Sequence, residues 1–76
     1  MPRLPRVTGP ELIRAFERAG YTVARTRGSH WILKNLDGKR VVIPHHATKV
    51  LPPGTVANIL REAGLTRDEL IDILSG

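Results

Sequence analysis

Apolar residues recur at helical spacing over residues 9–19, and charged residues fill most of the positions between them. The apolar face consists of Leu12, Ile13, Phe16 and Ala19. Thr8 and Glu11 stand three residues apart at the start of this segment, which is the capping-box pattern of a helix N-terminus. Gly20 suits a left-handed C-terminal cap. The sequence therefore predicts an amphipathic helix over residues 9–19.

The apolar period changes to two residues at Tyr21, which is the spacing of a β-strand. The first predicted strand covers residues 21–27 and ends at the break made by Gly28. Strict alternation along this strand places Arg25 and Arg27 on the same side as Tyr21.

Two further strands are predicted over residues 30–36 and 39–43. Asp37 and Gly38 lie between them, and this pair is the one most favoured in a two-residue type I′ hairpin. Pro44 ends the third strand because proline cannot donate to a β-ladder. Three strands joined by short turns predict an antiparallel meander.

The last part of the chain combines a proline-containing loop over residues 45–53 with two helical signals. The first signal is an apolar stripe of Val56, Ile59, Leu60 and Ala63. This stripe ends at Gly64, and Thr66 and Glu69 form a second capping box that opens a short C-terminal helix. Helices at both ends of a meander pack together on one sheet face, so we expect a single two-layer α+β domain over residues 1–76.

Length and composition fit one domain with a thin core, because a chain of 76 residues buries only ~60% of its unfolded surface. The chain has no cysteine and therefore neither disulfides nor a thiolate zinc site. It has no long apolar run, so we expect neither secretion nor membrane insertion but a cytoplasmic protein. Residues 1–7 form a proline-containing extension that is a candidate for disorder and receives no role.

The formal net charge is +5 and the sequence pI is near 10.8, which predicts an acidic partner. Residues 1–49 hold ten basic and three acidic side chains, whereas residues 50–76 hold two basic and four acidic ones. Nucleic acid is the commonest polyanion that such a basic surface binds. An acidic protein, or solvent alone, also satisfies this charge.

The segment Gly28-Ser29-His30-Trp31 places one histidine where a turn gives way to an apolar strand. The unperturbed pKa of imidazole lets it both accept and donate a proton near neutral pH, so a histidine beside cations suggests phosphodiester cleavage. The alternative is that His30 is a half-buried strand residue. Trp31 points to the opposite side from His30, which directs it into the core.

Four sequence elements follow one another at close spacing. They are Gly28-Ser29-His30, Val42-Ile43-Pro44 followed by His46, Pro53-Gly54-Thr55, and Ile59-Leu60-Arg61-Glu62-Ala63-Gly64-Leu65. Together they resemble the HicA family of toxins over nearly the whole chain. The resemblance implies a double-stranded-RNA-binding-domain-like α-β-β-β-α fold. It also implies a ribonuclease that cleaves messenger RNA and is held inactive by a cognate HicB antitoxin.

The resemblance implies that His30 is the catalytic residue. RNA supplies its own nucleophile in the 2′-OH, so the enzyme needs only to move protons and stabilise charge, and we expect neither a metal ion nor a cofactor. The RNA-binding candidates are Arg25, Arg27, Gly28, Ser29, Lys34, His46 and Lys49. Gly28 and Ser29 serve equally well as purely structural turn residues. His45 stands where the family more often has an apolar or small residue, and we expect it to be exposed.

Three functional hypotheses remain open. The leading one is a toxin-like, metal-independent endoribonuclease whose basic face is buried by an antitoxin. The second is a non-catalytic RNA-binding module of the same fold, and the third is an interaction protein that holds an acidic partner. His30→Ala separates the first two, since loss of cleavage with retained binding supports the enzyme. The absence of a salt-sensitive affinity for RNA favours the third.

Overall fold

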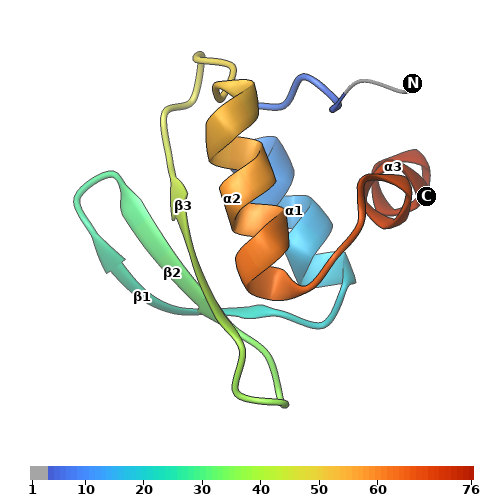
Figure 1. Cartoon of the computed structure of the whole chain (residues 1–76). Helices are drawn as coiled ribbons and strands as arrows, with labels where there is room; N and C mark the ends of the chain where they lie inside the picture. Colours follow the sequence, from blue (N-terminus) through green and yellow to red (C-terminus); the bar gives the residue numbers. More distant parts are fainter. Residues whose placement is uncertain (1–3) are drawn as a thin grey trace.

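The computed structural model describes residues 4–76. Its elements are α1 (Gly9–Arg18), β1 (Thr22–Arg27), β2 (His30–Lys34), β3 (Arg40–Pro44), α2 (Pro53–Ala63) and α3 (Arg67–Ser75). The strands form one antiparallel sheet in the order β1-β2-β3. Figure 1 shows α1 and α2 over the same face of this sheet. The predicted α+β meander is confirmed, and the arrangement is consistent with a double-stranded-RNA-binding-domain-like fold.

The core lies between this sheet face and the helices. Its largest fully buried side chains are Phe16, Leu12, Leu33, Ile43, Leu70, Val41 and Val56. The ring of Phe16 meets that of Tyr21 edge to face, with 5.0 Å between the ring centroids. The short helix α3 packs against α1, where Arg18 Nη1 donates a hydrogen bond to the carbonyl oxygen of Ile73 at 3.1 Å. Within residues 4–76, no helix covers the opposite, open face of the sheet.

Both predicted capping boxes are confirmed. At the start of α1, the Thr8 backbone N–H donates to Glu11 Oε1 at 2.8 Å, and the Glu11 N–H donates to the Thr8 hydroxyl at 3.3 Å. The same reciprocal pair joins Thr66 and Glu69 at α3. Gly20 follows α1 with a φ of 98°, the left-handed conformation that glycine adopts without strain.

A bulge at Ala24 overturns the predicted alternation of β1. Val23 pairs with Leu33, but the next paired residue, Arg25, stands opposite Ile32. Residues opposite each other share a face, so Val23 faces the core with Leu33 and Arg25 faces outward with Ile32. The extra residue changes the side on which all later residues of the strand lie.

The hairpin between β2 and β3 differs from the predicted two-residue turn. The backbone N–H of Asn35 donates to the carbonyl of Lys39, which encloses a loop of Leu36, Asp37 and Gly38. Asn35 Oδ1 accepts the N–H groups of Asp37 at 3.0 Å and Lys39 at 2.8 Å. Gly38 has a φ of 83° at the third loop position, as in three-residue hairpins with a glycine bulge. The amide of Asn35 therefore ends β2 at Lys34 rather than at Leu36.

The segment before α1 joins the core at Val7, whose side chain is 3% exposed. The carbonyl of Val7 accepts a hydrogen bond from the Leu51 N–H at 2.8 Å, and Thr8 forms a β-bridge with Val50. Residues 1–3 of the expected extension lie outside the described residues.

The capping box makes stability depend on the ionisation of Glu11. Hydrogen bonds from the backbone and hydroxyl of Thr8 hold the pKa of Glu11 below its ordinary value. A lowered folded-state pKa stabilises the protein above the unfolded carboxyl pKa, and this stabilisation is lost as the pH falls through the folded value. As the pH is lowered through this acidic range, the melting temperature of wild type should fall. We expect the melting temperature of Glu11→Gln to fall less. Glu17→Gln is the control on the same helix, and an equal change in both variants would contradict the prediction.

The close approach of Gly9 to the end of β3 generates a second stability prediction. A Cβ built on Gly9 would overlap the carbonyl oxygen of Pro44. We expect Gly9→Ala to lower the free energy of unfolding, measured in urea, by roughly 1–3 kcal/mol. Gly54→Ala is the matched control, because a Cβ there meets nothing within 4 Å. If Gly9→Ala is as stable as Gly54→Ala, this packing does not exist in solution.

Candidate functional site

His30 is the first residue of β2, and its side chain is exposed on the open face of the sheet. It stands opposite Arg27 of β1 and Pro44 of β3. Gly28 and Ser29 form the two-residue turn before it, with a φ of 57° at Gly28 and no positive φ at Ser29. This pattern is typical of a type II′ turn, whose first central position favours glycine. The tight turn therefore holds Arg27 and His30 next to each other.

Strand pairing arranges the open face in three rows across the sheet. The rows are Arg27–His30–Pro44, Arg25–Ile32–Val42 and Thr22–Lys34–Arg40. All four cations of the strands thus share one face with His30, and the strand sequences contain no acidic residue. Arg27 is the cation paired with His30, whereas Arg25 stands one row away. Lys34 lies in the far row. The predicted cations are therefore spread along the open face and do not cluster around His30.

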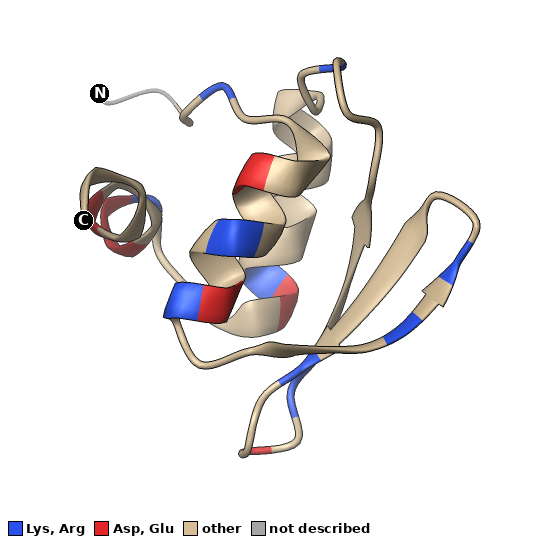
Figure 2. Cartoon of the chain, turned by 180° about the vertical axis from the view of Figure 1, so that it is seen from behind, with Lys and Arg blue, Asp and Glu red and all other residues tan. Residues whose placement is uncertain are grey.

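Helices and sheet differ in charge. Figure 2 shows most of the acidic positions on the helices, while basic positions mark β1 and the base of the β2–β3 hairpin. The acidic residues of the helices are Glu11, Glu17, Glu62, Asp68, Glu69 and Asp72. Asp37 in the hairpin loop is the seventh acidic residue of the chain. The open sheet face is therefore the strongly basic side of the domain.

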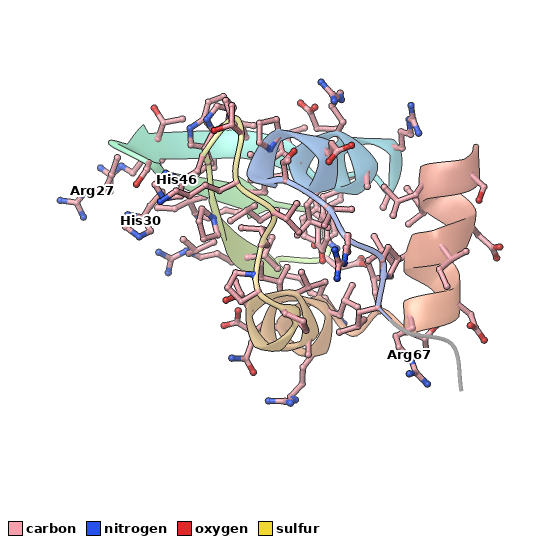
Figure 3. All side chains as sticks on the ribbon, turned by 90° about the horizontal axis from the view of Figure 1, so that it is seen from above. Arg27, His30, His46 and Arg67 are labelled. Carbon is pink, nitrogen blue, oxygen red and sulfur yellow. The ribbon has the colours of Figure 1, made fainter. Side chains whose placement is uncertain are left out.

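The loop after β3 brings His46 to the end of the sheet that carries His30. The His45 N–H donates to the carbonyl of Ser29 at 2.6 Å, which ties this loop to the β1–β2 turn. In Figure 3, His46, His30 and Arg27 lie at the same end of the molecule, far from Arg67. His46 is exposed there.

The expectation that His45 is exposed is wrong. Its side chain is partly buried and stacks on the indole of Trp31, with ring centroids 4.3 Å apart and an interplanar angle of 10°. Trp31 packs against the core, as its position opposite to His30 predicts. The stack forms because Trp31 lies at the rim of the core, where its outer surface is open to the neighbouring loop.

Lys49 is exposed in the turn that contains His46. Its backbone N–H donates to the carbonyl of His46 at 3.3 Å. The predicted site residues therefore divide into two sets. Arg27, Gly28, Ser29, His30, His46 and Lys49 lie around the β1–β2 turn and the loop after β3, while Arg25 and Lys34 extend away along the sheet.

Arg40 belongs to the basic face, although it was not among the candidates from the sequence. It stands directly opposite Lys34. The sequence does indicate that Arg40 is exposed, because it alternates with Val41 and Ile43 at the period of a strand with one buried side. Lys39, one residue earlier, is engaged elsewhere and donates from Nζ to the carbonyl of Ala63 at 3.3 Å.

No three His, Asp or Glu side chains gather in a metal-binding group within residues 4–76. None of the helices in the described part of the chain has the length and apolarity needed to cross a membrane.

Comparison with known proteins places this arrangement in a family. The family model described as HicA toxin of bacterial toxin-antitoxin matches residues 9–65, from the start of α1 to the residue after the cap of α2. The match contains the whole sheet and both His30 and His46. No curated protein matches the chain. Since the match covers more than half of the chain, this protein belongs to the HicA toxin family and is the toxin of a toxin–antitoxin system with a HicB-type antitoxin.

Proposed function

We propose that this toxin is an endoribonuclease that cleaves messenger RNA without a metal ion, with His30 as general acid/base. The observation that carries the proposal is the position of the exposed His30 imidazole, which shares an open face with four cations and stands opposite Arg27. A general acid/base must reach the proton that it transfers, and an exposed side chain beside a tight turn meets that requirement.

The chemistry needs two proton transfers. The 2′-oxygen attacks the adjacent phosphorus, a new O–P bond forms, and the bond from phosphorus to the 5′-oxygen breaks. One proton leaves the 2′-OH and one is delivered to the 5′-oxygen, giving a 2′,3′-cyclic phosphate and a 5′-OH. The His30 imidazole performs one of these transfers. The other falls to His46, to water or to the same imidazole.

The remaining site residues bind and orient the RNA. The Arg27 guanidinium can donate two hydrogen bonds to one phosphate and stabilise the charge that develops on its oxygens. Gly28 has no side chain and lets the phosphate approach the turn closely. The backbone carbonyl of Ser29 accepts the His45 N–H, and its hydroxyl can donate a hydrogen bond to RNA. Arg25, Lys34, His46 and Lys49 complete the proposed RNA surface.

The antitoxin has a defined role in this proposal. An acidic surface of the HicB-type partner would cover the basic sheet face and thereby exclude RNA from His30. Binding to the same face explains inhibition without any change in the conformation of the toxin.

The central test is cleavage of a defined messenger RNA in EDTA. We expect wild type to cut and His30→Ala to lose about 10²- to 10⁴-fold in rate, which is the usual contribution of a general acid/base. Because His30 is exposed, the variant should keep the wild-type melting temperature and RNA affinity. If neither protein cuts in EDTA while both bind RNA with the same salt dependence, the protein is a non-catalytic RNA-binding module.

His46→Ala identifies the second proton-transfer group. If His46 protonates the 5′-oxygen, the variant loses activity on RNA but recovers it on a substrate whose 5′-leaving group is an activated phenol, because such a group departs without protonation. Recovery of His46→Ala on this substrate would assign that transfer to His46. An equal loss on both substrates would show that His46 only binds RNA.

A further inference from the structure

The basic face has a second group of cations, which surrounds a depression away from His30. An open depression of about 360 Å³ is lined by Ala24, Arg25, Ile32, Lys34 and Arg40. Arg25 comes from β1, Lys34 from β2 and Arg40 from β3, so each strand contributes one cation to it. The fold thus gathers three positive charges around a single concave surface.

Repulsion between two of these cations destabilises the protein when no anion is bound. Lys34 and Arg40 stand directly opposite each other, and like charges at paired positions of a sheet repel. The strands offer no acidic residue that could neutralise them. A bound anion between the two side chains would remove this repulsion.

The three side chains are also uncommitted. Within residues 4–76, their charged groups make no hydrogen bond and no ion pair. Some other cations of the chain are engaged: Lys39 donates to the Ala63 carbonyl, and Arg61 donates from Nη1 to Asn58 Oδ1 at 3.0 Å. The donors of Arg25, Lys34 and Arg40 are therefore available for a ligand.

The far side of the depression, formed by Lys34 and Arg40, is too distant from His30 to serve the reacting phosphate. Lys34 lies four residues along β2 from His30, which at the rise of an extended strand is about 13 Å. One phosphodiester group cannot contact both positions. A strand that runs along the sheet can do so, because it presents a series of phosphates.

We propose that Arg25, Lys34 and Arg40 form a second phosphate-binding site, which holds the RNA backbone at a phosphate outside the scissile linkage. The proposal rests on the proposed function for the identity of the ligand. The site fixes the direction of the RNA strand over the sheet and contributes affinity, while the chemistry takes place at His30. Substrates too short to span both centres are bound at His30 alone.

The test of this site is the salt dependence of binding to a single-stranded RNA that carries 2′-O-methyl groups throughout and therefore cannot be cleaved. We expect Lys34→Gln and Arg40→Gln each to lower the slope of log Kd against log salt by about 0.7, the value for one phosphate contact on a single strand. Arg61→Gln removes the same charge from α2, on the other side of the sheet, and should leave the slope unchanged. Equal slopes for wild type and all three variants would overturn the proposal. The cations would then bind the acidic surface of a protein partner instead of RNA.

Cleavage kinetics separate the second site from the scissile site. We expect Arg40→Gln to raise KM for an oligoribonucleotide without changing kcat, and to leave cleavage of a dinucleotide unchanged. A fall in kcat on both substrates would place Arg40 at the reacting phosphate and overturn the proposal. The binding slopes remain decisive even if wild type cleaves no RNA, so failure of the second site and failure of the ribonuclease proposal are distinguishable. Arg40→Gln should melt at or above the wild-type temperature, because it removes a like-charge pair.

Discussion

The register of β2 between its two neighbours is the constraint on which both the core and the candidate site depend. Side chains alternate along a strand, so a slip of one residue would exchange the faces of Ile32 and Leu33. The bulge at Ala24 meets this constraint on the β1 side, since it keeps Val23 over the core and turns Arg25 outward. Most apolar side chains of the strands thereby stay with the helices, and the basic ones stay in solvent.

The open face is basic and yet contains a buried apolar residue. Ile32 is 8% exposed although it lies outside the core cluster on the helical side. The cations around it line the same depression, and the methylene stems of arginine and lysine cover apolar surface while their charged ends remain in water. Ile32 therefore does two things: it shields the centre of an uncovered sheet, and it supports the side chains that would bind phosphate.

The sequence predicts local features well where one residue type has one physical use. Thr8 with Glu11 marks a helix start, and the period-two pattern marks the three strands. It fails where a side chain or an inserted residue competes with the backbone pattern. The Asn35 amide closes a three-residue loop that the Asp37-Gly38 pair does not reveal, and the stacking of His45 on Trp31 joins segments that are distant in sequence. The position of His30 follows from its strand, but the extent of the basic face depends on the Ala24 bulge and on the pairing of Lys34 with Arg40.

The loop that carries His46 shows how a surface site is held in place by the fold. The backbone at Pro44 and His45 lies against Gly9, where α1 begins. The His45 N–H is bound to Ser29 in the turn before His30, and the His45 ring stacks on Trp31 at the rim of the core. Three contacts of different kinds thus fix one residue beside His46. The departure from the family pattern at His45 is consequently a positioning feature: an aromatic ring there couples the loop to the core, while the neighbouring histidine stays exposed.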